Sequence, residues 1–233
     1  LIMASGSGSN AEAIVKYYRN NLAGLLDFTV VCNRTPEVAG VYSRMEKFQI
    51  KTKYLPSPNN DFSKVANFLK LNRFDLIALA GYMRILPPEI VAQNNIINIH
   101  PSLLPFKYQG SKDAYQDTID NGDKIAGCTV HRVTADVDAG PRLAQIAFEI
   151  PDEIVANKDV DALKEIGLAH EHALYPAVVG NQIFGDKLPL NLVAIYDYAK
   201  QLATERKIPH KIHQLYPTVF TEYPCLLGPD NHR

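Results

Sequence analysis

The sequence predicts an α/β protein whose doubly wound, mostly parallel β-sheet carries an antiparallel edge. Short apolar runs of strand length alternate with segments in which apolar residues recur at helical spacing, from residue 1 to about residue 187. Residues 75–81 are apolar almost throughout, as expected for a central strand covered on both faces. Strands and helices that alternate in this way form open, Rossmann-like sheets, whose ligands bind beyond the carboxyl ends of the strands.

The first unit reads as a strand, a glycine-rich turn and a helix. Residues 1–4 are apolar, residues 5–10 read Ser-Gly-Ser-Gly-Ser-Asn, and apolar side chains then repeat at helical spacing to residue 22. Glycines allow an anion to approach the backbone closely, and the first amides of a helix point at it with a favourable dipole. The turn therefore predicts a phosphate site. The alternative is a flexible, capped turn, since the motif matches neither a Walker loop nor the dinucleotide fingerprint.

Three more strands and two helices are expected before residue 82. Residues 28–32 are apolar and β-branched, and a helix follows to about residue 48, with Pro36 in its first turn, where proline is tolerated. Residues 50–55 read as the third strand, and the Pro-Ser-Pro-Asn-Asn stretch at 56–60 as a loop. Residues 62–69 carry the apolar stripe of the next helix, which leads into the central strand.

A polar pair stands on the buried strand within residues 95–105. Asn98 and His100 lie two positions apart, so both point to one face while Ile99 packs on the other. Pro101 ends the strand at its carboxyl edge. An amide can donate to an oxygen that becomes negative, and an imidazole moves protons near neutral pH, so the pair suits acyl chemistry. The competing interpretation is that both side chains only satisfy backbone groups of a loop.

Asp138 lies in a loop between two later strands. Residues 110–121 look helical, residues 125–133 form a strand, and residues 142–150 form another after the tight loop 134–141. A carboxylate in such a loop is usually a solvated turn residue. Residues 161–180 read as one long helix, which contains Glu171.

The character of the sequence changes after residue 187, so we expect one domain over residues 1–187 and a C-terminal extension over residues 188–233. The extension begins with an amphipathic helix, which is marginal alone in water. We expect it to pack on the outer helices of the domain or on a second subunit, away from the active cleft. From residue 207 onward the proline-punctuated chain is expected to run as an extended strap. The apolar stripe of the helix consists of Leu192, Ile195, Tyr196, Ala199 and Leu202.

Composition favours a globular protein that binds small molecules. The 233 residues are 46% hydrophobic and 21% charged, which is enough for one substantial core. The formal net charge of -1 provides no general field for nucleic acid or anionic lipid, so we expect neither a nucleic-acid nor a membrane partner. A homo-oligomer remains open. No apolar run approaches the ~20 residues of a membrane span, and no signal peptide is visible.

Cysteine and histidine spacing argues against disulfides and metals. Cys32, Cys128 and Cys225 are far apart and form no Cys-x-x-Cys pair, which favours a reducing cytoplasm over a disulfide framework or a thiolate zinc site. His210 and His213 stand three apart, but two ligands without a nearby third are usually surface residues. We therefore expect no metal.

Five motifs follow one another along the chain: Ser-Gly-Ser-Gly-Ser-Asn at 5–10, Gly-Tyr-Met-Arg-Ile-Leu at 81–86, Asn-Ile-His-Pro-Ser-Leu-Leu-Pro at 98–105, Val-Asp-Ala-Gly-Pro at 137–141 and Glu-His-Ala-Leu-Tyr-Pro at 171–176. In this order they resemble the phosphoribosylglycinamide formyltransferase family. The resemblance covers roughly residues 1–187 and leaves the C-terminal extension unexplained. It implies transfer of a formyl group from 10-formyltetrahydrofolate to the amine of glycinamide ribonucleotide in purine biosynthesis.

The resemblance also implies roles for individual residues. Asn98 would donate to the oxyanion of the tetrahedral intermediate, His100 would stabilise it or shuttle protons, and Asp138 would orient His100 and accept a proton. The substrate phosphate would be held at the glycine-rich turn, and its ribose at the long helix. The expected substrate-binding residues are Gly8, Ser9, Asn10, Met83 and Glu171, and the expected folate-binding residues are Arg84, Ile85, Leu86, Thr134, Ala135, Asp136 and Val137.

The chain departs from the family pattern in several places. Residues 106–110 make the loop after Leu-Leu-Pro one residue longer than usual, which affects the substrate side of the site. Ala139 stands where a second glycine is common, and Leu168 where a polar helper of Glu171 is often found. No arginine is evident near residues 57–64 to bind the phosphate, so Lys64 is a candidate substitute.

Three other functions remain open at this point. A formyltetrahydrofolate deformylase would share the Asn, His and Asp set, but would use water as acceptor and normally carries an additional N-terminal domain. A methionyl-tRNA formyltransferase would lack the glycine-rich turn and carry a larger, basic C-terminal domain. A catalytically silent phosphosugar-binding module would not require all three polar side chains.

Overall fold

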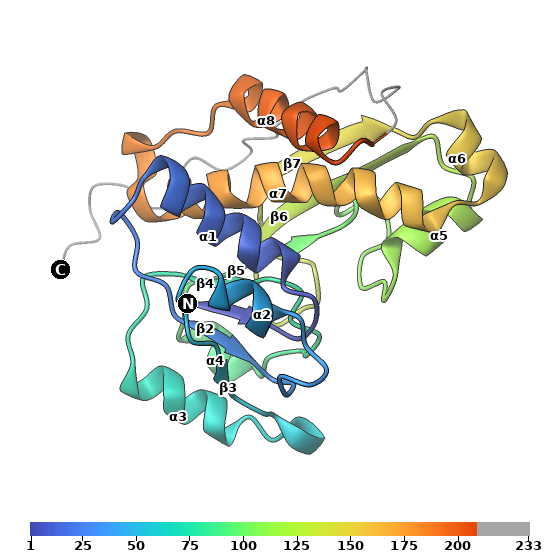
Figure 1. Ribbon diagram of the computed structural model, residues 1–233. Helices are drawn as coiled ribbons and strands as arrows, with labels where there is room; N and C mark the ends of the chain where they lie inside the picture. Colours follow the sequence, from blue (N-terminus) through green and yellow to red (C-terminus); the bar gives the residue numbers. More distant parts are fainter. Residues whose placement is uncertain (209–233) are drawn as a thin grey trace.

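The computed structural model describes residues 1–208, with the side chain of residue 192 excepted, and shows one sheet between layers of helices (Figure 1). The sheet has seven strands in the order β3-β2-β1-β4-β5-β6-β7. The predicted doubly wound, mostly parallel sheet with an antiparallel edge is confirmed. The expectations for Cys225, for His210 and His213, and for most of the strap fall outside the described residues.

The first five strands are parallel, and the last two pair antiparallel. The short strands β1 to β4 end at one edge, where the loops that follow them gather. The antiparallel pair closes the other side of the sheet and delivers the loop that holds Asp138. The strands are β1 (Ile2–Ala4), β2 (Val30–Cys32), β3 (Lys53–Tyr54), β4 (Ile77–Leu79), β5 (Ile96–His100), β6 (Ile125–Arg132) and β7 (Arg142–Glu149).

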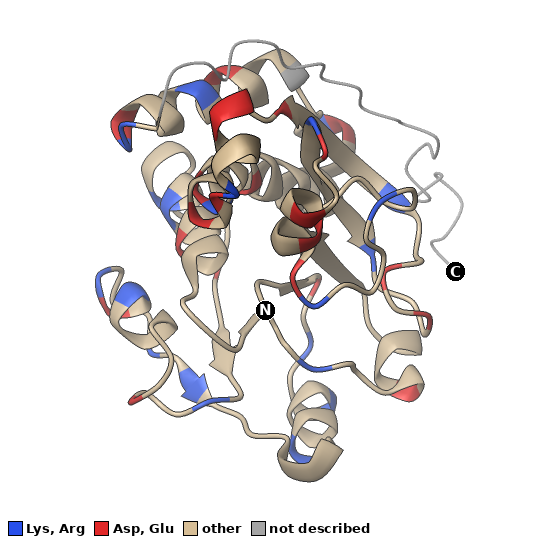
Figure 2. Ribbon diagram, turned by 90° about the vertical axis from the view of Figure 1, so that its right-hand side faces the viewer, with Lys and Arg blue, Asp and Glu red and all other residues tan. Residues whose placement is uncertain are grey.

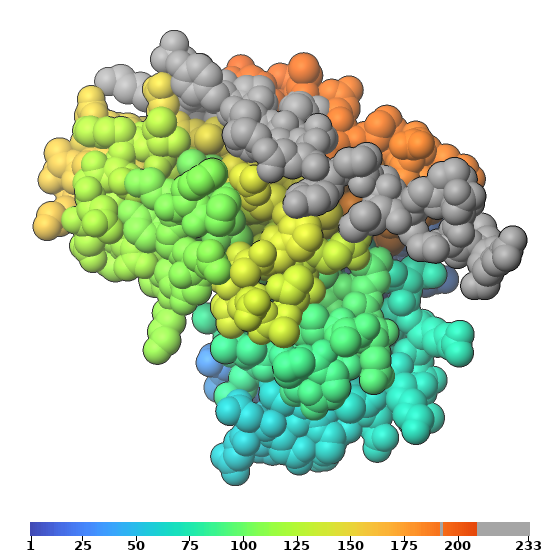
Figure 3. Space-filling model, turned by 180° about the vertical axis from the view of Figure 1, so that it is seen from behind, coloured from blue at the N-terminus to red at the C-terminus, as the bar shows by residue number. Residues whose placement is uncertain are grey.

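Two apolar clusters, one on each face of the sheet, make the core. The larger cluster joins α1 and α7 to the sheet, and the smaller joins α3 and α4 to the opposite face. Seen from behind, the green and yellow middle third of the chain lies above the cyan segment that contains α3 (Figure 3). The helices are α1 (Ser9–Asn21), α2 (Val41–Glu46), α3 (Ser63–Leu71), α4 (Pro88–Ala92), α5 (Ala114–Asp120), α6 (Asp152–Asn157), α7 (Val160–Phe184) and α8 (Leu192–Glu205), with short 3-10 turns at Pro58–Asn60 and Gly185–Lys187.

Several boundaries differ from the sequence prediction. The helix predicted up to about residue 48 is reduced to α2, because residues 35–39 form hydrogen-bonded turns that bring Gly40 beneath the glycine-rich turn. The helix predicted from residue 110 begins at Ala114, where the side chain of Asp113 caps it by accepting from the Gln116 amide. The short helices α4 and α6 were not predicted, since each begins directly after a proline and is too short to show helical periodicity.

A single buried tyrosine fixes α7 over the centre of the sheet. The Tyr175 hydroxyl lies 3.0 Å from the Leu79 carbonyl oxygen of β4 and 3.1 Å from the Ile97 carbonyl oxygen of β5. Tyr175 is itself fully buried. Glu171 stands one helical turn before Tyr175, so this contact sets where its carboxylate enters the cleft.

The C-terminal helix packs on the domain through its predicted stripe. Ile195, Ala199 and Leu202 are buried and belong to the same core cluster as the residues of α1 and α7. Helix α8 therefore lies against the outer helices, and its last turn reaches a cavity beside the glycine-rich turn. The division of the chain near residue 187 remains our proposal. Within residues 1–208, no helix is both long and apolar enough to span a membrane.

Candidate active site

The turn after β1 and the loop after β4 meet at the carboxyl edge of the sheet. The Ser5 amide donates to the Gly81 carbonyl at 3.1 Å, and the Met83 amide donates to the Ser5 hydroxyl at 2.8 Å. A cavity of about 610 Å³ opens beside them and reaches the end of β5. These three segments therefore meet at one edge of the sheet.

Asn98, His100 and Asp138 line this cavity together. Asn98 and His100 share one face of β5, and His100 Nδ1 lies 3.4 Å from Asp138 Oδ2. Asp138 adopts a left-handed backbone with φ 52°, which Asp tolerates better than most residues. This conformation turns its carboxylate toward β5 instead of solvent, and the Gly110 amide donates to Oδ2 at 3.1 Å.

A second histidine, His131, belongs to the group, although no motif in the sequence marks it. His131 Nε2 lies 3.4 Å from Asp138 Oδ1 and 3.3 Å from Asn98 Nδ2. The antiparallel register places His131 opposite Asn98 in the sheet. The sequence shows that His131 and Thr129 lie two positions apart on one strand face. Only the register of β6 against β5 shows that His131 pairs with Asn98.

The hydrogen bonds assign the protons on both imidazoles. A carbonyl oxygen only accepts, so the contact of His100 Nε2 with the Tyr108 carbonyl at 3.0 Å places the proton on Nε2. In the same way His131 donates from Nδ1 to the Arg132 carbonyl at 3.1 Å. His100 Nδ1 and His131 Nε2 are therefore the atoms that face Asp138, and a proton on either nitrogen would be shared with its carboxylate.

Burial and charge keep His100 neutral and Asp138 ionised near neutral pH. Burial lowers the pKa of His100 below its usual value, although Asp138 and the Tyr108 carbonyl oppose the shift. Burial raises the pKa of Asp138, but the contacts with His131, His100 and the Gly110 amide outweigh it and hold the pKa below the usual range. The group is consequently ready to act as a base.

The longer loop at residues 106–110 connects the two halves of this group. Tyr108 has a left-handed backbone with φ 53°, which aims its carbonyl at His100, while its hydroxyl donates to Asp123 at 2.6 Å. Gln109 donates to the Val137 carbonyl at 3.2 Å. The additional length therefore joins the end of β5 to the loop of Asp138.

Glu171 enters the cavity from α7 with both carboxylate oxygens occupied. Asn10 donates to one oxygen and Tyr115 to the other, each at 2.6 Å. Burial raises the pKa of Glu171, and the two donors oppose that shift. The Tyr115 hydroxyl fits only because residue 167 is glycine, since a Cβ there would lie 2.0 Å from it. Tyr115 thus supports Glu171, while Leu168 lines a different cavity.

The other end of the cavity is apolar and open. Met83, Ile85 and Val137 are exposed by 65%, 70% and 43%, which suits a flat aromatic ligand better than water. Arg84 donates to the Ser57 carbonyl at 3.3 Å. Its guanidinium therefore lies beside the segment 57–64, which itself contains no arginine. The predicted residues that line the cavity are Asn10, Met83, Arg84, Ile85, Leu86, Asn98, His100, Thr134, Ala135, Val137, Asp138 and Glu171.

Asp136, Gly8 and Ser9 are not among the residues that line this cavity. Gly8 has φ 76°, and a Cβ on it would lie 2.5 Å from Val41, so glycine is required there for packing as well as conformation. Ser9 is the first residue of α1 and lines a neighbouring cavity. Lys64 lines neither cavity.

Charge and metal-ligating residues are distributed without a dominant cluster. Figure 2 shows Lys and Arg interspersed with Asp and Glu along the described chain. Among residues 1–208, no three His, Cys, Asp or Glu side chains group so that they could hold a metal ion. Cys32 and Cys128 are both buried free thiols.

Comparison with known proteins places the geometry in context. The family model described as formyl transferase matches residues 1–179. A phosphoribosylglycinamide formyltransferase of Bacillus subtilis is 36% identical over 192 residues, which cover 79% of this chain and 93% of that protein. The trifunctional purine biosynthetic protein adenosine-3 of Drosophila melanogaster is 33% identical over 80% of this chain, but the match spans only 14% of that longer protein.

Solved structures agree with the sequence matches. The phosphoribosylglycinamide formyltransferase of Bacillus halodurans has 32% identity and a TM-score of 0.69, covering 79% of this chain and 94% of that one. The enzyme of the same name from Coxiella burnetii, solved in complex with CHES, has 31% identity and a TM-score of 0.69 over 79% of this chain and 86% of that one.

Proposed function

This chain belongs to the formyl transferase family, and from that premise we propose that it is a phosphoribosylglycinamide formyltransferase. It transfers the formyl group of 10-formyltetrahydrofolate to the primary amine of glycinamide ribonucleotide, a step of de novo purine biosynthesis. Both substrates are small molecules, and the reaction needs no metal in this proposal. The single observation that carries it is the arrangement of Asn98, His100, His131 and Asp138 in one cavity, which Glu171 also lines.

Asn98 stabilises the oxyanion by donating a hydrogen bond. The amine attacks the formyl carbon, a C–N bond forms, and the carbonyl oxygen becomes negative. One hydrogen of Asn98 Nδ2 is engaged by His131, which leaves the second for that oxygen. His131 therefore also orients the donor, because its contact holds the amide plane in the cleft.

Asp138, with the imidazoles beside it, carries out the proton transfers of the reaction. The attacking nitrogen carries an excess proton after the C–N bond forms, and the folate nitrogen must gain one before it leaves. Asp138 takes the first proton and returns one to the folate nitrogen, directly or through water. His100 Nδ1, 3.4 Å from Asp138 Oδ2, accepts the hydrogen bond of the protonated acid and so stabilises it.

The two ends of the cavity suit the two substrates. The ribose hydroxyls of the ribonucleotide bind at Glu171, whose carboxylate Asn10 and Tyr115 hold in position. The folate ring binds between the exposed apolar side chains after β4 and those of the loop after β6, with Met83 at the boundary between the substrates. The catalytic group lines the same cavity as both sets of binding residues, which supports this arrangement.

A formyl-transfer assay tests the proposal. Purified protein is supplied with 10-formyltetrahydrofolate, with and without glycinamide ribonucleotide, and both tetrahydrofolate and formylated product are measured. Equal amounts of both products, formed only with the ribonucleotide, are expected. Tetrahydrofolate release without the ribonucleotide would instead identify a deformylase, and no turnover in either case would identify a silent binding module.

A further inference from the structure

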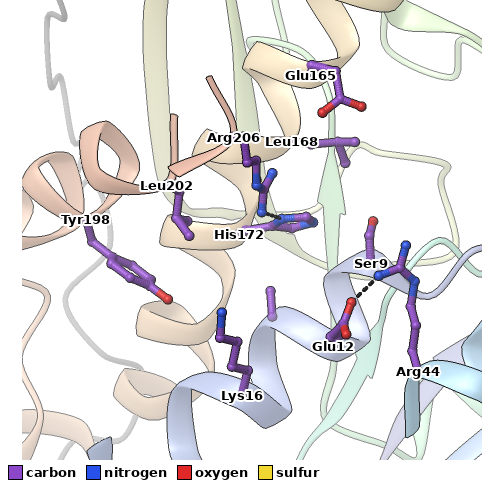
Figure 4. A pocket seen from close by; sticks show the side chains of 11 residues that line it. Ser9, Glu12, Lys16, Arg44, Glu165, Leu168, His172, Tyr198, Leu202 and Arg206 are labelled. Atoms are coloured by element: carbon purple, nitrogen blue, oxygen red, sulfur yellow. Dashed lines mark hydrogen bonds and ion pairs between the residues drawn. The ribbon is translucent and has the colours of Figure 1, made fainter. Parts of the chain in front are cut away.

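A second cavity lies behind the glycine-rich turn, between α1, α7 and α8 (Figure 4). Its volume is about 370 Å³. Ser9 lies at its α1 side, Leu168 and His172 on α7, Tyr198 on α8, and Arg206 at the C-terminal cap of α8. The C-terminal extension, which the family match does not include, therefore forms one wall of a cavity that begins at the proposed phosphate turn.

Arg206 determines the state of His172. Arg206 Nη2 lies 2.6 Å from His172 Nδ1, and a guanidinium can only donate, so Nδ1 is the acceptor. Burial, with smaller contributions from Arg206 and Arg44, lowers the pKa of His172 to about 3. The ring is therefore neutral, and its proton resides on Nε2.

The Nε2–H group of His172 has no partner within residues 1–208. His172 is only 6% exposed, and Nε2 is a buried polar atom without a hydrogen bond to the described chain. A buried donor without an acceptor is costly, commonly by about 1–3 kcal/mol. Figure 4 shows the imidazole between Arg206 on one side and Ser9 on the other. The donor thus belongs to the wall that faces the first turn of α1.

Positive charge surrounds the same position. Arg44 donates from Nε to the Ser7 carbonyl at 3.0 Å, which ties it to the glycine-rich turn, and Lys16 and Arg206 line the cavity with it. Two carboxylates line it as well. Glu12 forms ion pairs with Arg44 and with Lys47, whereas Glu165 is exposed.

We infer that His172 binds the phosphate of the ribonucleotide through Nε2–H, and that Arg206 of the C-terminal helix is its positioning residue. The inference rests on the proposed function for the identity of the ligand. A phosphate at the N-terminus of α1 provides the acceptor that Nε2–H lacks. Arg206 keeps the ring in the donor tautomer and adds long-range attraction for a dianion. Arg44 supplies the positive charge for the phosphate, for which the sequence had offered only Lys64 as a candidate.

The test compares Arg206→Met with Lys200→Met, using the full-length protein and inorganic phosphate as the probe. Lys200 lies on the same helix but outside the cavity, with its ammonium 4.3 Å from the centre of the Tyr196 ring. The ¹⁵N resonances of the His172 ring report the tautomer and the contact with phosphate. In the unaltered protein and in Lys200→Met, phosphate is expected to shift Nε2. In Arg206→Met the ring is expected to lose its single tautomer, and phosphate to bind about tenfold more weakly.

Kinetics provide the second measurement. Arg206→Met is expected to raise the KM for glycinamide ribonucleotide about tenfold and to raise that for 10-formyltetrahydrofolate much less. His172→Gln, whose amide can donate near the position of Nε2, is expected to retain more ribonucleotide affinity than His172→Phe. Because Arg206 is exposed, its variant remains informative if both His172 variants fail to fold.

The outcomes separate this inference from the proposed function. A phosphate titration that shifts the amides of Ser9 and Asn10 but leaves His172 Nε2 unchanged overturns the inference. So does an active enzyme in which Arg206→Met and Lys200→Met have the same KM for the ribonucleotide. If the unaltered protein shows no formyl transfer, the proposed function fails, and the phosphate titration still decides whether His172 binds an anion.

Discussion

His100 Nδ1 and Asp138 Oδ2 lie 3.4 Å apart, and neither atom carries a proton when the imidazole is neutral. The ring places its only proton on Nε2, where it donates to the Tyr108 carbonyl. When His100 is protonated, both N–H groups have acceptors, because Nδ1 then donates to Asp138. Burial favours the neutral ring and the carboxylate favours the cation, so this distance determines how readily the group takes up a proton.

The pH dependence of turnover follows from this contact. The pKa of His100 is lowered, so the neutral ring persists to below its ordinary value of 6.5. We expect kcat/KM to fall with decreasing pH only below about 6.5, as the ring becomes protonated. Asp138→Asn removes the charge that raises the pKa, so the ring should titrate at still lower pH. NMR titration of His100 measures this directly.

The neighbouring variant Asp136→Asn is the control for that experiment, since Asp136 lies in the same loop but does not line the cavity. This variant is expected to leave the pKa of His100 unchanged. A rise in the pKa of His100 in Asp138→Asn would contradict the assigned contact.

Removing the oxyanion donor should affect turnover more than binding. Asn98→Ala is expected to reduce kcat by about 10²–10³, because the lost hydrogen bond strengthens as the formyl oxygen becomes negative. The KM for 10-formyltetrahydrofolate should change little. Steady-state kinetics with both substrates measure this. Asn72→Ala, at the end of α3, removes an amide far from the cavity and serves as control; equal losses of kcat and folate affinity would argue against the role.

The support of Glu171 by Tyr115 predicts a selective binding defect. Tyr115→Phe removes the 2.6 Å hydrogen bond to the carboxylate, so the pKa of Glu171 should rise further and the carboxylate should lose its fixed orientation. We expect the KM for the ribonucleotide to increase about tenfold. Tyr42→Phe, which removes a bond to the Arg34 carbonyl, is the matched control. An unchanged ribonucleotide KM in Tyr115→Phe would show that Glu171 needs no such support.

Gly8 is required for folding as well as for any ligand. Gly8→Val introduces a Cβ at φ 76° and within 2.5 Å of Val41, so we expect a loss of at least about 1–3 kcal/mol in the free energy of unfolding. Urea unfolding measures the effect. Gly6→Ala, in the same turn but with no atom within 4 Å of the new Cβ, should be nearly as stable as the original protein.

Buried histidines should make the protein sensitive to acid. Burial lowers the pKa of His170 to about 4, whereas the unfolded chain binds the same proton near 6.5. Between these values the unfolded state binds more protons, so stability is lost as pH falls below 6.5. The contribution of His170 between pH 7 and pH 5 is about 2 kcal/mol. His170→Gln should reduce the pH dependence of the unfolding free energy by that amount; an unchanged dependence would contradict it.

Local sequence determined the fold class and predicted the principal residues of the candidate site. Alternating strands and helices, with an apolar central strand, specify a parallel sheet because each pattern reflects which faces of an element are buried. The period of two along β5 places Asn98 and His100 on one face, and the turn after β1 marks the edge where ligands bind. These features depend only on neighbouring residues, so they could be predicted without coordinates.

Tertiary structure decided which distant residues complete the site. His131 faces Asn98 because of the antiparallel register between β5 and β6, and Tyr115 reaches Glu171 because Gly167 leaves room for its hydroxyl. Arg206 contacts His172 because α8 packs against α7. Register and helix packing arise from contacts between residues far apart in the chain, and no local period encodes them.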